Sequence, residues 1–182
     1  MSTWRSILEQ LVRERGRALF GYAYVLTGDR EAAQDLVQDA LVRAFKGGRV
    51  STSLDAAHVY VKKAIATSFI DRSRRAAVRP RSVDGAMIDV AWPLPDHSSG
   101  SDASIDLQAA VLGLAPRERA CIVMRYMEDM RVDEIAAALG LAPGTVKRYL
   151  HEAILRLRAA LPELEFSDFD TTDVTTRHGG AR

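Results

Sequence analysis

The segment from residue 131 to residue 161 limits the possible folds of this chain more than any other. It reads RVDEIAAALGLAPGTVKRYLHEAILRLRAAL. Apolar residues recur at helical intervals on both sides of Gly140, which predicts two short helices, each with one buried stripe. The stripe residues are Val132, Ile135, Ala136 and Leu139 before the glycine, and Val146, Leu150, Ala153, Leu157 and Leu161 after it.

Two residues define the turn and the start of the second helix. Gly140 can adopt the positive φ that a sharp reversal after Leu139 requires. Pro143 suits the first position of a helix, because it fixes φ and lacks only an amide hydrogen that would have no helical partner there. This register is typical of a helix-turn-helix that reads DNA.

The first two turns of the second helix carry residues that lie off the apolar stripe. In a recognition helix, such positions face base edges and phosphates in the major groove, so we expect Lys147 and Arg148 to be the leading DNA contacts. The alternative is the solvated face of an ordinary helical hairpin. The candidate DNA-binding residues here are Pro143, Gly144, Thr145, Lys147, Arg148 and His151.

Composition excludes several other classes of protein. The 182 residues are 47% apolar and 27% charged, as in a soluble globular protein of one domain or two small ones. No stretch is long and apolar enough to span a membrane. Charges interrupt the first 17 residues, which therefore predict an amphipathic helix and not a signal peptide. We expect a cytoplasmic protein.

Residues suited to metal binding or catalysis do not cluster. Cys121 is the only cysteine, so it predicts a core residue and neither a disulfide nor a zinc site. The four histidines are scattered, and no phosphate-binding loop, dinucleotide fingerprint or nucleophile elbow is present. The sequence therefore predicts no metal, no cofactor and no enzymatic activity.

Charge is unevenly distributed although the net charge is only +1. Residues 28–40 are acidic, with four carboxylates against Arg30. Residues 62–81 are basic, with seven Lys and Arg residues against Asp71. This separation predicts two surfaces of opposite charge.

The periodicity predicts an all-α fold with two small helical domains joined by a flexible linker. The first helix is expected at 3–26. The second is expected to begin at about residue 30, with Asp29 as its cap, and to end at the glycines at 47 and 48. The third is expected at 54–75, with Ser53 as its cap. Two more, at 105–112 and 116–128, precede the helix-turn-helix. The domains expected are 1–79 and 105–162, with a linker at 80–104 and a disordered tail at 163–182. The linker could stretch to roughly 75 Å.

Buried positions are also expected in the first domain. The second helix should bury one stripe and the third helix another. These residues are Ala33, Leu36, Val37, Ala40, Leu41, Ala44 and Phe45 in the second helix, and Val61, Ala64, Ile65 and Phe69 in the third.

Several motifs in fixed order carry a family resemblance. They are YVLTGDREAAQDLVQDALVRAF, the basic helix YVKKAIATSFIDRSRR, a linker, and LAPRERACIVMRYMEDMRVDEIAAALGLAPGTVKRYLHEAILRLR. Over about residues 15–162 the chain resembles bacterial RNA polymerase sigma factors of the extracytoplasmic-function (ECF) type, in the sigma-70 family. The resemblance implies a protein that binds core RNA polymerase and directs promoter recognition, DNA melting and transcription initiation.

The resemblance also implies roles for the two charged regions. The acidic helix, through Asp35, Gln38 and Asp39, would dock on the clamp helices of the beta-prime subunit. The first domain would read and melt the minus-ten promoter element, with loop residues 49–53 holding an unstacked base. Its phosphate contacts would be Lys62, Lys63, Arg72, Arg74 and Arg75.

The second domain would read the minus-thirty-five element and rest on the flap of the beta subunit. An anti-sigma factor is a further partner that the family implies. The chain departs from the family at three places. Thr67 stands where the family often has Asn, and Ala142 stands where it usually has Ser. The aromatic residue that the family commonly has before the basic helix is missing, and His58 and Tyr60 are the nearest rings. Two rival interpretations remain. A stand-alone helix-turn-helix regulator would explain neither the acidic DLVQD face nor the basic helix, and an enzyme acting on nucleic acid would need a metal or nucleophile constellation that the sequence lacks.

Overall fold

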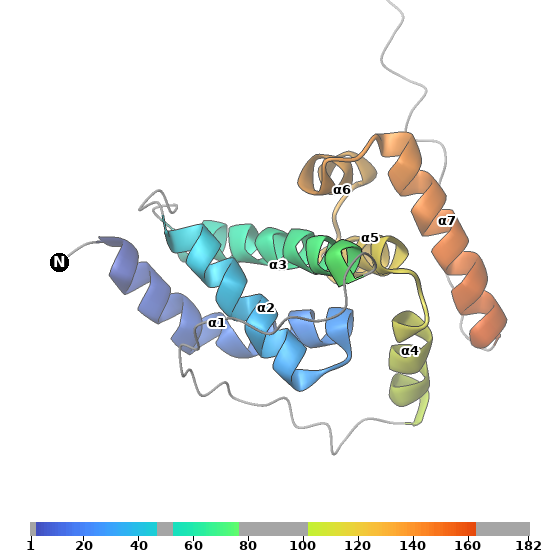
Figure 1. Ribbon diagram of the computed structural model, residues 1–182, viewed down its shortest axis with the longest axis horizontal. Coiled ribbons are helices and arrows are strands. Elements are labelled where there is room, and N and C mark those ends of the chain that lie inside the picture. The colour runs from blue at the N-terminus through green and yellow to red at the C-terminus, as the bar shows by residue number, and fades with distance from the viewer. Residues whose placement is uncertain (1–2, 47–52, 77–101, 163–182) are drawn as a thin grey trace, which may run out of the picture.

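The computed structural model describes residues 3–46, 53–76 and 102–162, and within these ranges it contains seven helices and no strand (Figure 1). The expected all-α fold is confirmed. Most of the expected linker, most of the loop that was expected to hold a base and the expected tail lie outside the described residues. The last three residues of the expected linker, 102–104, are instead helical, because the helix that was predicted from 105 begins at Asp102. The helices are α1 (Thr3–Thr27), α2 (Arg30–Phe45), α3 (Leu54–Ala76), α4 (Asp102–Leu112), α5 (Pro116–Tyr126), α6 (Val132–Leu139) and α7 (Pro143–Ala160).

Helices α1, α2 and α3 pack against one another as a three-helix unit. Both expected caps are confirmed: the Asp29 carboxylate accepts the amide of Ala32 at 2.8 Å, and the Ser53 hydroxyl accepts that of Ala56 at 3.3 Å. All seven α2 residues expected to be buried are buried. These local signals therefore define the first domain.

Helix α3 buries more than the one stripe predicted for it. Val61, Ile65 and Phe69 are buried as expected, but Ala64 is only half-buried. Ala57, Ala66 and Ser68 are buried instead. The reason is that α3 is covered on two sides, by α1 and α2 and also by α5 and α6.

The helix-turn-helix has the expected register. Gly140 adopts φ 64° and ψ 38°, and the following amide, of Leu141, donates to the carbonyl of Ala136 at 2.9 Å. Pro143 is the first residue of α7. The preceding Ala142 forms no side-chain cap, so the start of α7 depends on the proline and on packing.

Helix α5 ends at Tyr126 and not at Glu128 as predicted. Asp129 takes a positive φ of 50°, and Arg125 donates to the carbonyl of Met130 at 3.0 Å, which closes a turn before α6. Glu128 is thereby placed in a loop and not on the helix.

A buried acid joins α5 to α7. The carboxylate of Glu118 accepts the amide of Ala115 at 3.2 Å and forms an ion pair with Arg156 of α7. Only 4% of the Glu118 side chain is exposed, so this pair fixes one helix against the other. The sequence contains a sign of this buried acid: Glu118 lies one helical turn before Ile122, which is buried, so a charged residue falls on the apolar stripe of the helix.

The two helical units are docked on each other. Helix α3 contacts α5 and α6, and α1 contacts α4 and α5 (Figure 1). The sequence predicted two domains and a linker but contained no signal for this contact.

His58 makes the stability of the first unit depend on pH. Burial, followed by the charges of Lys62 and Arg15, lowers the pKa of His58 to about 4, with Asp55 opposing. An unfolded histidine takes up a proton near its ordinary pKa of 6.5, so stability falls as the pH drops from about 6.5 toward 4.

We expect the wild type to lose about 1 kcal/mol more stability than His58→Gln between pH 7 and pH 5, allowing for the partial exposure of the ring. Urea unfolding of both proteins at the two pH values measures this difference. Equal losses would show that His58 does not carry this pH dependence.

Candidate functional site

The acidic face of α2 contains Asp35, Gln38 and Asp39, the predicted polymerase contacts. Asp35 is exposed, whereas Gln38 and Asp39 are half-buried. Asp39 forms an ion pair with Arg72 of α3, whose guanidinium also donates to the carbonyl of Asp35 at 3.2 Å. The two aspartates are therefore not equivalent. The Asp39 side chain joins α2 to α3 through its ion pair, whereas the Asp35 carboxylate is exposed to solvent.

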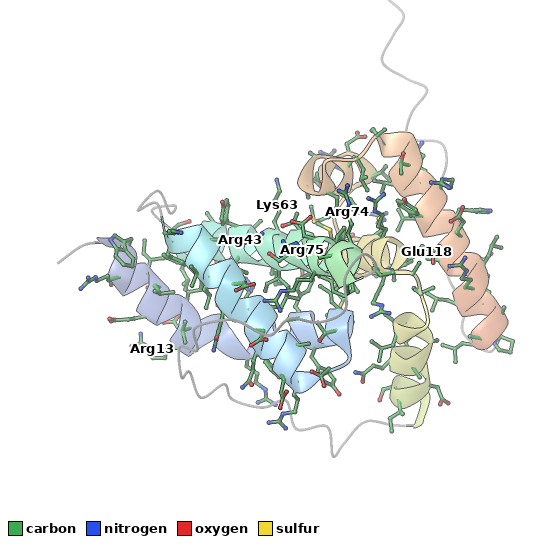
Figure 2. The ribbon with its side chains drawn as sticks, in the orientation of Figure 1. Arg13, Arg43, Lys63, Arg74, Arg75 and Glu118 are labelled. Carbon is green, nitrogen blue, oxygen red and sulfur yellow. The ribbon has the colours of Figure 1, made fainter. Side chains whose placement is uncertain are left out.

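The five basic residues predicted on α3 fall into two groups. Lys63, Arg74 and Arg75 are exposed along the helix (Figure 2). Arg72 and Lys62 are instead engaged by carboxylates. Arg72 pairs with Asp39, and Lys62 donates to both carboxylate oxygens of Glu128 at 2.7 and 2.8 Å.

The start of α3 exposes an aromatic ring. Tyr60 is 55% exposed, beside Val59 at 66%. Of the two rings that the sequence offered for stacking on a base, Tyr60 is accessible, whereas His58 is half-buried. The Thr67 hydroxyl, where the family often has Asn, donates to the carbonyl of Lys63 at 3.0 Å.

The predicted recognition face lies on the first two turns of α7. Pro143, Gly144, Arg148 and His151 are exposed, while Thr145 and Lys147 are half-buried. The Arg148 guanidinium lies 5.0 Å from the ring centroid of Tyr149 and 3.7 Å from the Glu152 carboxylate. Its side chain is 60% exposed, so the ring orients a guanidinium that remains accessible.

Cys121 is a core residue, as predicted. It is fully buried, and burial raises the pKa of its thiol to about 12, so the thiolate is not formed at neutral pH. Within the described residues, no three His, Cys, Asp or Glu side chains form a group that could hold a metal ion. Nor does any helix in those ranges have the length and apolarity to cross a membrane.

Family models match both units of the chain. The model of sigma-70 region 2 matches residues 11–79, and that of sigma-70 region 4 matches residues 104–157. The chain belongs to the sigma-70 family. The region 2 match contains the acidic and basic helices, and the region 4 match contains most of the helix-turn-helix.

Named relatives support the same family. The chain is 36% identical over 171 residues to an RNA polymerase sigma-E factor of Streptomyces avermitilis, covering 89% of this chain and 87% of that protein. It is 32% identical over 163 residues to the ECF RNA polymerase sigma factor SigL of Mycobacterium tuberculosis, covering 87% and 91%. The ECF assignment is therefore confirmed.

A solved structure shares the fold. It is the sigma factor RpoE of Bartonella quintana in complex with the anti-sigma factor NepR, with a TM-score of 0.57, 22% identity, and coverage of 91% of this chain and 100% of that one. Together with the two family regions, these likenesses support a sigma factor that directs core RNA polymerase in promoter recognition and transcription initiation, over a stand-alone regulator.

Proposed function

We propose that three charged surfaces, on α2, α3 and α7, divide the work of a sigma factor as their charges indicate. The observation that carries this proposal is the separation of an exposed acid on α2 from exposed bases on α3 and α7. The acid faces a basic surface of the polymerase, and the bases face DNA. The protein acts in the cytoplasm with the polymerase and has no catalytic activity of its own.

On α2, Asp35 is the main contact with the clamp helices of the beta-prime subunit. It is exposed, so a basic surface of the polymerase can approach its carboxylate directly. Gln38 supplies a polar contact beside it. Asp39 contributes mainly by positioning, since it is already paired with Arg72.

On α3, Lys63, Arg74 and Arg75 contact the phosphates of the minus-ten element, and Tyr60 offers a ring to an unstacked base. On α7, Lys147, Arg148 and His151 read the minus-thirty-five element. The second unit also rests on the beta flap.

Reading both elements requires the units to separate. The names of the two elements place them roughly 25 base pairs apart, which is about 85 Å of duplex. Helix α3, the longest DNA-contacting element, has 23 residues and so spans only about 35 Å. In the docked arrangement α6 contacts α3 and α7 contacts α6, so α7 and α3 are separated by about one helix diameter of roughly 10 Å. Docked units therefore cannot reach both elements, and polymerase must hold them apart. An anti-sigma factor, such as the one bound to the structural neighbour, would oppose the separation of the two units.

We expect the purified chain to bind promoter duplex poorly on its own but to give core polymerase a defined start site. Run-off transcription on a promoter library, with core alone as the control, measures this. Tight binding to a palindromic operator as a dimer, without start-site selection by polymerase, would contradict the sigma assignment and favour a stand-alone regulator.

A further inference from the structure

One ion pair crosses between the two units at a predicted DNA contact. Lys62 of α3 donates to both oxygens of Glu128, which lies in the loop after α5, and the two side chains are only 19% and 17% exposed. The Lys62 ammonium also lies 5.7 Å from the ring centroid of the buried Tyr22. This lysine is therefore occupied, and a DNA phosphate could reach it only if Glu128 left.

A second contact fixes the units in this arrangement. The guanidinium of Arg119, on α5, donates to the carbonyl of Leu26 at the end of α1 at 2.6 Å and lies 5.6 Å from the ring centroid of Phe69. It also donates to the carbonyls of Leu112 and Leu114 in its own unit. The Leu112 side chain in turn abuts Gly28, where an added Cβ would lie 2.7 Å from it.

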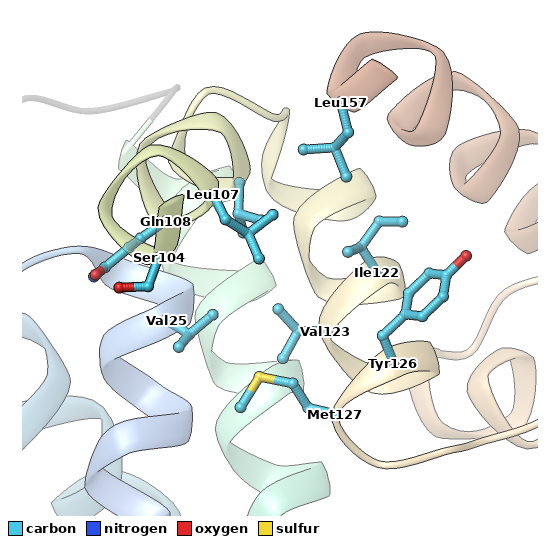
Figure 3. A pocket seen from close by; sticks show the side chains of 10 residues that line it. Val25, Ser104, Leu107, Gln108, Ile122, Val123, Tyr126, Met127 and Leu157 are labelled. Atoms are coloured by element: carbon cyan, nitrogen blue, oxygen red, sulfur yellow. The ribbon is translucent and has the colours of Figure 1, made fainter. Parts of the chain in front are cut away.

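The apolar part of the same interface is incompletely packed. A half-open apolar pocket of about 410 Å³ lies at the edge of this interface, lined mostly by α4 and α5 of the second unit, among them Leu107 and Val123, with Val25 of α1 contributed by the first unit (Figure 3). The apolar side chains that line the pocket lack packing partners on its open side. Contacts between two units of one chain resemble transient protein–protein interfaces, and relative motion of the units is expected unless the contact is large and apolar.

We propose that Glu128 is an internal competitor of DNA, which occupies the phosphate-binding position at Lys62 and keeps the free protein closed. This inference rests on the proposed role of α3 in binding promoter DNA. A carboxylate and a phosphate oxygen are alternative acceptors for the same ammonium group. Opening of the units releases Lys62 together with the face of α3 that α6 covers.

The test uses Glu128→Gln, which keeps the shape of the side chain and removes its charge. Asp129→Asn is the matched control, since it removes the same charge one residue away from a fully exposed side chain. Dyes at Arg43→Cys on α2 and Leu155→Cys on α7, both exposed positions, report the distance between the units by energy transfer. The buried Cys121 remains unlabelled.

We expect Glu128→Gln to lengthen the distance between the dyes and to bind promoter DNA about tenfold more tightly without polymerase. Asp129→Asn should match the wild type in both measurements. The double variant Lys62→Glu, Glu128→Lys should restore the short distance between the dyes, because the ion pair is re-formed with its charges reversed.

An unchanged distance in Glu128→Gln would overturn the proposal, as would a longer distance with no gain in DNA affinity. Equal gains in Glu128→Gln and Asp129→Asn would also overturn it, because they would reflect net charge alone. The distance between the dyes is measured without DNA and without polymerase, so it does not depend on the proposed function. A failure of the proposed function would appear separately, as wild-type protein that gives core polymerase no start site.

Discussion

Asp35→Lys is expected to lower the affinity of the chain for core RNA polymerase by about a hundredfold. The carboxylate is exposed on α2, and its replacement by an ammonium group would place like charges opposite each other at a basic docking surface. The fold should persist, because the described structure gives Asp35 only a backbone bond to Arg72. Binding to immobilised core polymerase, with thermal unfolding alongside, measures both effects.

Asp106→Lys is the matched control, since it reverses an exposed acid on α4 in the other unit. It should bind core polymerase as the wild type does. Asp39→Asn should weaken binding less than Asp35→Lys and should lower stability, because it breaks the pair with Arg72. If core affinity were unchanged in Asp35→Lys, the assignment of α2 as the docking helix would have to be abandoned.

The difference between Asp35 and Asp39 illustrates what the sequence could predict. The caps at Asp29 and Ser53 and the left-handed Gly140 depend on residues within one or two turns, and these three were predicted correctly. All seven helices were also predicted, although α4 begins before and α5 ends before the predicted residue. The pairing of Asp39 with Arg72 joins residues 33 positions apart. No periodic pattern contains that information.

The same reason explains why Lys62 was grouped with the exposed bases. Its partner, Glu128, is 66 positions away, and the prediction placed that residue on a helix and not in the loop that brings it to α3. No pattern in the sequence points to Arg119. Its function depends on carbonyls at the ends of α1 and α4, which become available only when the two units dock.

Arg148→Ala is expected to weaken holoenzyme binding to promoters with an intact upstream element by roughly 5- to 150-fold, the range of about 1–3 kcal/mol for one specific base contact. The guanidinium is already oriented over Tyr149, and its contact with Glu152 is long and exposed, so a base edge can replace that carboxylate at little cost. Filter binding of the reconstituted holoenzyme measures the loss.

A promoter with a scrambled upstream element is the control that separates reading from general charge. On that promoter Arg148→Ala should equal the wild type, because there is no specific contact left to lose. Arg148→Lys distinguishes the kind of contact: a lysine can replace a point charge at a phosphate but not the planar fork that pairs with guanine. Equal losses on both promoters would place Arg148 among the phosphate contacts, and upstream sequence selection would then belong to Lys147, His151 or their neighbours on α7.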